Sequence, residues 1–457
     1  MRTAANNHLD ASRTVPDGII VIGGGWAGLT AAVELARHGR KPLVLEAARQ
    51  VGGRARSLRF DSLVVNNGQH FLLGAYRSVL AMLETLGIPE ARVLRRAPFG
   101  LLLKSALEAE IRLHTRPLPA PLHLLWALLT ARGLGVGARL AALRLVLRAR
   151  RDRFEVRPDV ALIYYLRQCE QPAEATRTLW QPLCQAALAT PIEHASTKLF
   201  LRVLRDFFFG RHSHSDLLMP TAPLVDCLPR PAMEFIEAHG GSVRVGTRAQ
   251  SIRLGDDGAV TGVQLRDQVL PARHVILATQ SDAAAVLLRE HTATTALAQQ
   301  LDRIESHPVY TLYLEYPSSV SLPEALVGIL DGTVHWLFDH GRISGRPGLL
   351  AAVISGPGAH TYLANEALTE LIIRDITRLY PQWPTPSVTH LVREKHATLA
   401  ATPETEILRP KTVTPIKRLW LAGDYTATGY PSILEGAVRS GIITARRILR
   451  DEQRRDR

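Results

Sequence analysis

Long apolar runs are missing from this 457-residue chain, in which no stretch of 18 residues is both apolar and uncharged. The first 17 residues are polar and contain no apolar core of the kind found in signal peptides. A helix that crosses a bilayer needs about 20 consecutive, predominantly apolar residues. We therefore expect neither a signal peptide nor a transmembrane helix, and we predict a cytoplasmic protein.

Cysteine is scarce, and its three copies are widely spaced within mixed helical sequence. An odd number of scattered cysteines indicates reduced thiols with a structural role and argues against a redox-active pair. His212-x-His214 with Asp216 superficially suggests a metal site, but a fourth ligand and regular spacing are lacking, so we expect no metal. The three cysteines are Cys169, Cys184 and Cys227.

Lysine is rare as well, because 49 of the 55 basic residues are arginines, which are scattered rather than gathered into one tract. The formal net charge is +13, yet no nucleic-acid-binding motif accompanies the arginines. We therefore expect no nucleic-acid partner. A basic surface also suits docking on anionic lipid head groups or on an acidic partner, and we favour a membrane surface.

A glycine-rich turn near the start of the chain carries the clearest motif. Residues 19–28 join an apolar strand to a helix through Gly23-x-Gly25-x-x-Gly28. Gly23 allows a tight turn, Gly25 lets the main chain approach a pyrophosphate, and Gly28 lets the helix close onto the strand. Free N–H groups at the helix N-terminus would face the anion. This turn predicts binding of a dinucleotide, either FAD or NAD.

The residues that follow strengthen the dinucleotide prediction. Their pattern predicts a helix over 27–38 that stops at Gly39, and a second strand over 42–45. That strand delivers Glu46 to the place where a cofactor ribose would present its hydroxyl groups. A βαβ unit with a purely structural role would not need an acidic residue there.

The predicted fold class is α/β, with a discontinuous Rossmann-like domain and an interleaved α+β substrate domain. A strand meander over 243–279, a strand over 419–424 and a long helix over 433–450 indicate that the chain returns twice to the first domain. The predicted ranges are 17–75, 220–290 and 410–457 for the dinucleotide-binding domain, and 76–219 and 291–409 for the substrate domain.

The substrate domain is expected to combine helices with a sheet. Residues 76–219 show mostly helical spacing of apolar residues. Strands are expected over 309–316, 335–338 and 349–354, followed by a helix over 365–380. We interpret these later segments as a sheet floor with a helix over it.

An arginine-rich pair of amphipathic helices is predicted within 117–153. Its apolar segments 122–129 and 140–147 flank a flexible, glycine-rich stretch over 133–137. One interpretation is an ordinary helix pair of the substrate domain with a solvated face. The other is a segment that contacts a lipid monolayer and forms the entrance for a lipid.

Three separated signatures cover nearly the whole chain, namely residues 23–54, the meander over 243–279, and Gly423-Asp424 followed by residues 435–441. Together they resemble the flavin-containing amine oxidase and carotenoid desaturase superfamily. Two motifs more than 340 residues apart most resemble the squalene-associated flavoenzymes, the hydroxysqualene dehydroxylases of bacterial hopanoid synthesis. These motifs are Asn67-Gly68-Gln69-His70-Phe71-x-x-Gly74-x-Tyr76 and Gly423-Asp424-Tyr425-x-x-x-Gly429-Tyr430-Pro431-Ser432.

The resemblance implies a non-covalently bound FAD as the cofactor of the first domain. The glycines of the first turn would lie at the pyrophosphate, Glu46 at the adenosine ribose and the backbone of Ala249 at the adenine. Asp424 would take the ribityl or phosphate end, and the last helix, starting near Ile433 and Leu434, would point its positive end at the flavin N1–C2=O edge. The expected cofactor contacts are Gly23, Gly25, Trp26, Ala27, Gly28, Glu46, Ala47, Gly53, Arg54, Gly68, Gln69, His70, Phe71, Ala249, Gly423, Asp424, Ile433 and Leu434.

Two departures from the amine oxidase pattern disfavour amine oxidation. Those enzymes resemble one another in a lysine that holds a water at flavin N5, and this chain has no lysine between Lys198 and Lys395. Where they carry an aromatic wall beside the flavin, this chain has Ile433. It also has one dinucleotide fingerprint, so we expect no separate NAD(P)H domain and a supply of reducing equivalents from outside or from a small reductant.

The substrate that the resemblance implies carries an allylic hydroxyl, which must be protonated to leave before a hydride from reduced flavin quenches the carbocation. His70, beside the predicted flavin contacts, is the first candidate for a catalytic acid, although it could serve only as a hydrogen-bond partner of the cofactor. Tyr430 is a second candidate, as an acid or a cation-facing ring; the alternative is core packing on Pro431. An apolar tunnel would use Phe200, Leu204 and residues 207–209, which could equally be ordinary core.

We predict an FAD-dependent oxidoreductase that converts hydroxysqualene to squalene. Its substrate would be an isoprenoid lipid, its place peripheral on the inner face of the cytoplasmic membrane, and its candidate partners other squalene-pathway enzymes. One alternative is a phytoene-type polyene desaturase or another oxidoreductase of the superfamily, which the direction of electron flow would separate from a dehydroxylase. The other is a flavin-bearing scaffold at the membrane surface, which would keep its partners and pathway flux without FAD.

Overall fold

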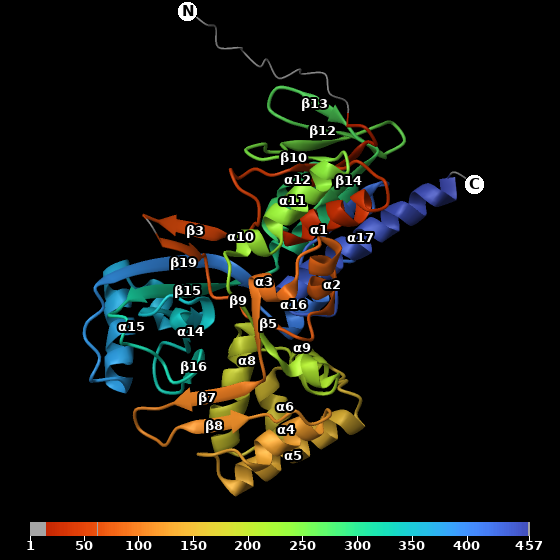
Figure 1. The fold of residues 1–457 in the computed structure, drawn as a ribbon. Helices are drawn as coiled ribbons and strands as arrows, with labels where there is room; N and C mark the ends of the chain where they lie inside the picture. The colour runs from red at the N-terminus through yellow and green to blue at the C-terminus, as the bar shows by residue number, and fades with distance from the viewer. Residues whose placement is uncertain (1–14, 62, 456–457) are drawn as a thin grey trace, which may run out of the picture.

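The computed structural model describes residues 15–61 and 63–455, whose arrangement is shown in Figure 1. A parallel sheet with its covering helices forms one part of the molecule, and a larger mixed sheet forms a second part. A block of helices packs beside the mixed sheet. The chain passes repeatedly between these parts, so that residues far apart in the sequence meet at their boundary.

The parallel sheet is built from short strands, most of them apolar, that come from three parts of the chain. Within the described residues its order is β10-β2-β1-β14-β20, and every neighbouring pair is parallel. Continuous apolar strands are typical of a parallel sheet covered on both faces. The strands are β1 (Ile19–Ile22), β2 (Leu43–Leu45), β10 (Ser242–Arg244), β14 (His274–Leu277) and β20 (Leu419–Leu421).

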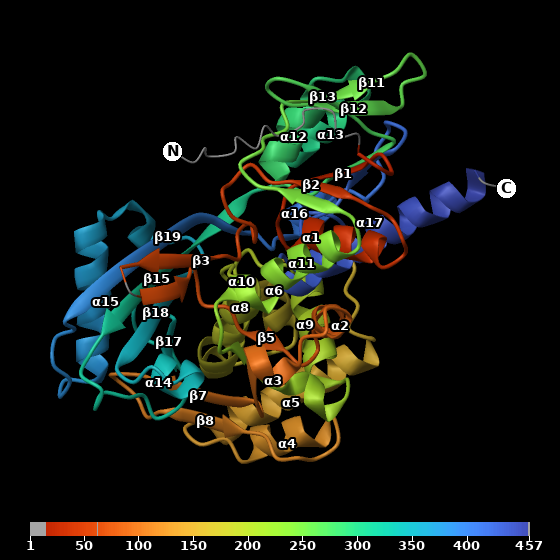
Figure 2. The same ribbon diagram turned by 45° about the horizontal axis from the view of Figure 1, so that its top comes forward.

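Both faces of the parallel sheet are covered. Helices α1, α11 and α17 pack on one face, while α12, α13 and the small antiparallel sheet β11-β12-β13 pack on the other. Figure 2 shows β11, β12 and β13 at one end of the molecule. The bounds are α1 (Trp26–Ala36), α11 (Pro229–Ala238), α17 (Leu434–Arg455), α12 (Ser281–Arg289), α13 (Thr295–Asp302), β11 (Ser251–Leu254), β12 (Val260–Gln264) and β13 (Val269–Pro271).

The elements predicted for this part of the chain are confirmed. The helix expected over 27–38 is α1, the strand expected over 42–45 is β2, and the helix expected over 433–450 is α17. The meander over 243–279 supplies β10 and β14 to the parallel sheet and β11–β13 to the antiparallel one.

The mixed sheet has a helix-covered face and a face toward the helical block. Its order within the described chain is β19-β15-β18-β17-β16-β7-β8. Alternate residues of β15 point to opposite faces, so Tyr310 packs with α15 while Tyr313 joins the core shared with the helical block. The bounds are β7 (Gly100–Lys104), β8 (Ile111–His114), β15 (Ser306–Glu315), β16 (Leu326–Ile329), β17 (Trp336–Asp339), β18 (Leu349–Ser355), β19 (Val388–Leu399) and α15 (Asn365–Leu379).

The interpretation of residues 76–219 as mostly helical needs a correction. The block also contains the strands β6 (Leu94–Ala97), β7, β8 and β9 (Leu217–Pro220). β7 and β8 form strands because β7 pairs in parallel with β16 and extends the mixed sheet. Such pairing between distant segments is not visible in local apolar spacing.

The helical block is illustrated by α9 (Thr197–Phe208), which positions part of the site. Phe200, Leu204 and Phe207 recur at helical spacing and are buried, and the Ser196 hydroxyl caps the helix by accepting the N–H of Leu199 at 3.1 Å. The other helices of the block are α4 (Leu122–Leu129), α5 (Val136–Arg151), α6 (Leu162–Gln168), α7 (Ala173–Ala175), a π-helical turn (Thr176–Trp180) and α8 (Gln181–Leu188). The helices α2 (Arg77–Thr85) and α3 (Glu90–Val93) instead share the core of α1 and α17.

The remaining elements are short and connect these parts. A hairpin of β3 and β4 lies beside the mixed sheet in Figure 1, and β5 pairs with β9. Their bounds are β3 (Ser57–Phe60), β4 (Leu63–Asn66), β5 (Leu72–Leu73), α10 (Leu224–Cys227), α14 (His340–Ser344), α16 (Pro403–Leu408), and the 3-10 turns His212–Ser215, Thr292–Thr294 and Ala359–Tyr362.

The three thiols are free, and two of them, Cys184 and Cys227, are buried. Burial raises the pKa of Cys227 to about 12 and also raises the pKa of Cys184, so both are protonated thiols at neutral pH. Among residues 15–61 and 63–455, no helix is both long and apolar enough to cross a membrane.

Candidate active site

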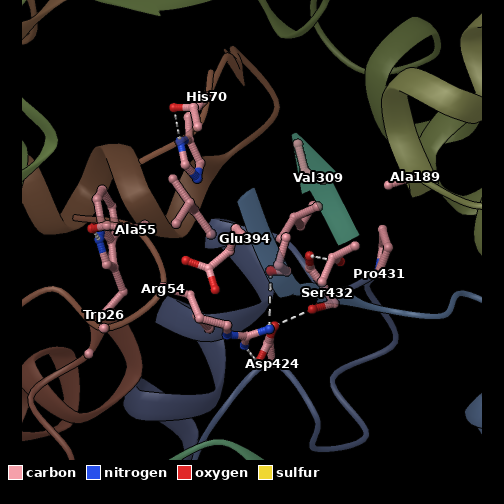
Figure 3. Close-up of a pocket in the computed structure, with 18 of the residues that line it drawn as sticks. Trp26, Arg54, Ala55, His70, Ala189, Val309, Glu394, Asp424, Pro431 and Ser432 are labelled. Carbon is pink, nitrogen blue, oxygen red and sulfur yellow. Dashed lines mark hydrogen bonds and ion pairs between the residues drawn. The ribbon is translucent and has the colours of Figure 1, made fainter. Parts of the chain in front are cut away.

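A cavity of about 910 Å³ lies where the parallel sheet, the mixed sheet and the helical block meet. One end is lined by the turn after β1, the turn around Arg54 and the loop around Asp424. The other end is lined mainly by aromatic and aliphatic side chains of α9 and the mixed sheet. Figure 3 shows that residues far apart in the sequence, such as Arg54, Glu394 and Asp424, converge on this space.

The turn between β1 and α1 forms the floor of the polar end. Gly23 has a φ of +114°, and a Cβ atom there would lie 2.6 Å from the carbonyl oxygen of Ala278. At Gly28 a Cβ atom would lie 2.0 Å from the carbonyl oxygen of Gly23, so this glycine permits the contact of helix and strand. A Cβ atom at Gly25 would meet only the Cα atom of Gly53, at 3.8 Å, and would project toward the cavity.

Glu46 follows β2 at the carboxyl edge of the parallel sheet. Its Oε2 accepts the N–H of Gly24 at 2.7 Å, and its Oε1 accepts the N–H of Ala48 at 2.7 Å. These two bonds fix the carboxylate beside the glycine turn, where it lines the cavity. Ala249 lines the same cavity from the segment before β11.

The turn around Arg54 is held against the first helix. The Trp26 indole N–H donates to the carbonyl of Ala55 at 3.3 Å, and the N–H of Gly52 donates to the carbonyl of Gly24 at 2.8 Å. These bonds place Gly53 opposite Gly25. The indole of Trp26 therefore fixes the turn, while the residue also lines the cavity at the N-terminus of α1.

Arg54 joins the first turn to the last loop of the site. Its Nη2 donates to Oδ1 of Asp424, and its Nη1 donates to the carbonyl of Ala397 at 3.3 Å. The Ser432 hydroxyl donates to Oδ2 of Asp424. Burial alone would raise the pKa of Asp424, but Arg54, Ser432 and the nearby Arg409 together hold the pKa below its ordinary value. The Asp424 carboxylate is therefore ionised and already held by two donors (Figure 3).

Arg409 is a buried residue that the sequence interpretation did not identify. It forms an ion pair with Glu406 at 2.6 Å, and its guanidinium donates to the carbonyls of Asp424, Thr426 and Tyr430. These bonds fix the loop that carries Asp424 and Tyr430. The pairing of Glu406 and Arg409 at spacing i, i+3 was a visible signal, but it is common on surface helices.

The Gln69 side chain ties its turn to the second part of the molecule. Its Nε2 donates to the Tyr313 hydroxyl at 3.0 Å and lies 2.9 Å from Nε2 of His340. The Tyr313 hydroxyl donates to the carbonyl of Asn66 at 2.7 Å. Burial lowers the pKa of His340 to about 4, so this ring is neutral and its Nε2 accepts from Gln69. Gln69 thereby anchors the segment that presents His70.

His70 faces the cavity with a defined tautomer. Its Nδ1 lies 2.9 Å from the carbonyl oxygen of Gly68, which can only accept, so Nδ1 carries the proton. The other ring nitrogen turns into the cavity, as Figure 3 shows. Burial lowers the pKa of His70, although the bond to Gly68 partly opposes the shift. The resting side chain is therefore mainly neutral at pH 7, with an acceptor nitrogen toward the cavity.

Glu394 on β19 is a second residue that the sequence interpretation missed. Its Oε2 accepts from Nδ2 of Asn67 at 3.1 Å and lies 3.6 Å from Nη2 of Arg56. In Figure 3 its carboxylate lies between His70 and Arg54. No strand was predicted at β19, whose polar and charged residues obscure the alternation of an edge strand, so the direction of Glu394 could not be inferred.

The apolar end of the cavity contains most of the residues expected for a substrate tunnel. Phe200, Leu204, Phe207 and Phe208 of α9 line it. Phe209 does not, because its ring packs on Phe154 with ring centroids 4.9 Å apart. Further apolar lining comes from Leu101, Val203, Leu326, Trp336, Phe338 and Val353.

A polar pair, Tyr430 and Asp206, also lines the cavity. The Tyr430 hydroxyl donates to Oδ2 of Asp206, which also accepts from Nε of Arg202 at 3.1 Å. The guanidinium groups of Arg202 and Arg439 lie 4.8 and 4.6 Å from the centroid of the Tyr430 ring. Burial raises the pKa of Tyr430, and the Asp206 carboxylate raises it further. Tyr430 is consequently a weak acid whose ring already contacts two cations.

Tyr430→Phe tests the strength of this pair. Removing a buried hydrogen bond to a carboxylate is expected to lower the free energy of unfolding by about 1.5–3 kcal/mol. Combined with Asp206→Asn, the loss should be smaller than the sum of the two single losses. Chemical denaturation measures both quantities, with the exposed Tyr362→Phe as the control. A loss for Tyr430→Phe no larger than that of Tyr362→Phe would contradict the contact.

The predicted cofactor residues converge on one cavity with one exception. Gly28 lies behind the turn, in contact with Gly23, and does not line the cavity. Ile433 and Leu434 line it at the start of α17. Among the described lining residues none is lysine, and the described chain holds no group of three or more histidine, cysteine, aspartate or glutamate residues that could bind a metal ion. The other lining residues from the prediction are Gly23, Gly25, Trp26, Ala27, Glu46, Ala47, Gly53, Arg54, Gly68, Gln69, His70, Phe71, Ala249, Gly423, Asp424 and Tyr430.

Comparisons with known proteins agree with this geometry. A family model described as flavin containing amine oxidoreductase matches residues 26–449. A hydroxysqualene dehydroxylase from Rhodopseudomonas palustris is 30% identical, over 92% of this chain and 96% of that protein. A 15-cis-phytoene desaturase from Glycine max is 24% identical, over 96% of this chain and 80% of that protein. The crystal structure of an oxidoreductase from Methanosarcina mazei, 16% identical, is similar with a TM-score of 0.74 over 94% of this chain and 99% of that one, which confirms the predicted fold class.

Proposed function

Because this chain belongs to the flavin-containing amine oxidoreductase family and is an FAD-dependent oxidoreductase, we propose that it converts hydroxysqualene to squalene. The observation that carries the proposal is a single cavity that joins a glycine-lined polar end to an apolar chamber. A dinucleotide fits the first and the hydrocarbon chain of an isoprenoid fits the second. The named relatives support the choice of this alcohol as the substrate.

The polar end fits FAD. Gly25 leaves open space where a pyrophosphate would pass, and the first N–H groups of α1 lie beside it. Glu46, held by two backbone amides, would bind the adenosine ribose. Asp424 and Arg54 would lie nearer the flavin, beside the start of α17, whose positive end favours negative charge.

The proposed reaction replaces a carbon–oxygen bond by a carbon–hydrogen bond. A proton joins the leaving hydroxyl to form water, and the carbon receives a hydride equivalent, so the alcohol is reduced by two electrons. Bound FAD, when reduced, supplies that hydride equivalent and is oxidised. An external two-electron reductant must then restore it. The chain's task is to orient the alcohol, exclude water from the reacting carbon and deliver the proton.

His70 is the proposed proton donor, acting through the ring nitrogen that faces the cavity. Its lowered pKa means that the protonated form is scarce at pH 7, but this form is a stronger acid than ordinary imidazolium. Tyr430 is a weaker candidate, because its hydroxyl proton is directed at Asp206. We propose instead that the Tyr430 oxygen accepts a hydrogen bond from the substrate hydroxyl and orients it.

His70→Gln tests this role through the pH dependence of turnover. The protonated fraction of a group falls about tenfold for each pH unit above its pKa. Turnover by the native enzyme should therefore rise as the pH falls toward the lowered pKa of His70. The variant should turn over more slowly, and its turnover should not show this rise. FAD content serves as the control and should be unchanged. The same rise in the variant would exclude His70 as the acid.

A second candidate function is polyene desaturation. It is supported by the similarity to the Glycine max phytoene desaturase and by the apolar chamber, which accepts a hydrocarbon as readily as an alcohol. In that reaction the lipid loses a hydride and a proton, and electrons flow into the cofactor. The direction of electron flow therefore separates the two functions.

An anaerobic single turnover separates them directly. The protein, with its flavin chemically reduced, is mixed with hydroxysqualene in detergent while flavin absorbance is followed and the lipid is extracted. Dehydroxylation predicts flavin reoxidation matched by squalene. Reduced flavin that stays reduced without squalene would contradict it. Oxidised protein that becomes reduced on addition of a partly saturated polyene would favour desaturation.

We place the protein peripherally on the inner face of the cytoplasmic membrane. The proposed substrate and product are isoprenoid lipids, which partition into bilayers. Other squalene-pathway enzymes are then candidate partners, because they would release the alcohol into the same bilayer. Fractionation of cells at low and high salt tests this placement. Recovery of the protein in the soluble fraction at both salt concentrations would contradict it.

A further inference from the structure

We propose that the outer face of the α4–α5 hairpin docks on an anionic lipid bilayer. This deepens the membrane placement above by naming the surface that makes the contact. The hairpin consists of α4, the connecting segment 130–135, and α5. In Figures 1 and 2 both helices lie at the end of the molecule opposite β12 and β13.

The outer face of α5 carries a stripe of leucine, valine and arginine. Val136, Leu140, Arg144, Leu147 and Arg151 are all exposed and follow one another at spacings of four, four, three and four residues. This spacing puts them on one side of a helix. The exposed fractions of Val136, Leu140 and Leu147 are 68%, 44% and 55%.

The neighbouring helix adds apolar side chains to this surface. Leu122 and Leu129 of α4 are 52% and 50% exposed. Trp126 lies between them in the sequence and is half-buried, with the guanidinium of Arg116 4.5 Å from its ring centroid. An indole beside a cation is an amphipathic group suited to a membrane–water interface.

The core of the protein is packed by a different face of the hairpin, so the exposed leucines are not needed for packing within the chain. Ala138, Ala142, Leu145 and Ala149 of α5 are buried in the same apolar cluster as Leu101, a residue that lines the cavity. The helix therefore has two apolar faces, one packed on the wall of the candidate active site and one exposed. Packing within the chain accounts for the first face only.

The charge of the hairpin matches an anionic surface. From Arg116 to Arg151 the sequence contains seven arginines and no aspartate or glutamate. Asp152 is the acidic residue that follows, lying 3.0 Å from Nε of Arg151 and 3.8 Å from Nε of Arg148. Glu174 also contacts the hairpin, because its Oε1 accepts the N–H of Gly135 at 2.7 Å. These two carboxylates offset only part of the charge of the seven arginines.

The mixture of leucine and arginine favours a bilayer over a protein partner. Arg144 and Arg148 directly flank Leu147 and line a shallow recess with it, so cationic and apolar groups share one face, as a bilayer with anionic head groups above an apolar interior requires. An interfacial helix places leucines below the head groups and arginines among the phosphates. Each arginine near an anionic surface contributes about fivefold in binding.

Vesicle flotation of the FAD-loaded protein tests the proposal. The native protein is expected to bind vesicles of phosphatidylcholine with phosphatidylglycerol, to bind phosphatidylcholine alone much more weakly, and to dissociate at high salt. The triple variant Leu129→Ser, Leu140→Ser, Leu147→Ser should bind at least about tenfold more weakly. The double variant Arg144→Gln, Arg151→Gln should bind about 25-fold more weakly. The matched control, Val269→Ser, Tyr362→Ser, Ile407→Ser, removes three exposed apolar side chains elsewhere, two of them more exposed than the leucines, and should bind as the native protein does.

Three results would overturn the proposal: no vesicle binding by the native protein, equal binding to both lipid compositions, or a loss of binding in the control variant equal to that in the leucine variant. Light scattering tests one more outcome that would overturn the proposal. If the native protein is a dimer and the leucine variant is a monomer, a second copy of the chain covers this face. The assay contains no substrate, and turnover in detergent should be unchanged in the leucine variant. Failure of the docking surface is therefore distinguishable from failure of the proposed dehydroxylation.

Discussion

Gly25→Val is expected to abolish FAD binding without unfolding the protein. Gly25 has a φ of −79°, which valine can adopt, and its added Cβ atom would touch only the Cα atom of Gly53. The rest of the valine side chain would then occupy the space between the two glycines, where the pyrophosphate must approach the main chain. The purified variant should be colourless, with native circular dichroism.

Gly137→Val is the matched control for this substitution. Nothing lies within 4 Å of a Cβ atom at Gly137, which is on α5 and away from the cavity. The control should retain a full complement of flavin, measured as flavin absorbance per protein after gel filtration. Normal flavin content in Gly25→Val would contradict the assignment of the cofactor cradle.

Arg409→Met is expected to lower the free energy of unfolding by about 3–5 kcal/mol. The side chain of Arg409 is 2% exposed, and its loss would leave Glu406 buried without its cation. It would also release the carbonyls of Asp424 and Tyr430, so FAD affinity should fall together with stability. Urea denaturation with and without added FAD measures the two effects separately.

Two further variants show whether the effect comes from the buried charge. Adding Glu406→Gln to Arg409→Met should restore part of the lost stability, because no unpaired carboxylate then remains. Arg303→Met removes an exposed ion pair with Glu404 and should cost less than about 1 kcal/mol. Equal losses for Arg409→Met and Arg303→Met would contradict the role given to Arg409.

The parts of the site that rest on local geometry could be predicted from the sequence. The turn at Gly23 and Gly25 and the acid at Glu46 need only one βαβ unit, whose strand, helix and glycines occupy fewer than 30 consecutive residues. The apolar segment expected over 122–129 coincides with α4 for the same reason, because its spacing is local. A short glycine motif was sufficient for the first and local apolar spacing for the second.

The parts that rest on distant pairing could not be predicted. The strands β7 and β8 were not predicted within the mostly helical pattern of residues 76–219, because only the contact with β16 makes them an extension of the mixed sheet. Glu394 lies on a strand that was not predicted. Asp206 precedes the aromatic residues at the end of α9, and its partner Tyr430 lies over 200 residues away in the sequence. The direction of a side chain follows from the strand or helix that carries it, so these residues had no local signal.

The most direct test of the central claim is the mass of squalene formed in a single anaerobic turnover in deuterium oxide. The hydrogen on N5 of reduced flavin exchanges with solvent, so transfer of a hydride equivalent from N5 predicts squalene with one deuterium at the carbon that carried the hydroxyl. Proton delivery by His70 to the leaving hydroxyl adds no further label, because that deuterium leaves in water. Unlabelled squalene, or no squalene while the flavin stays reduced, would contradict reductive dehydroxylation by the bound flavin.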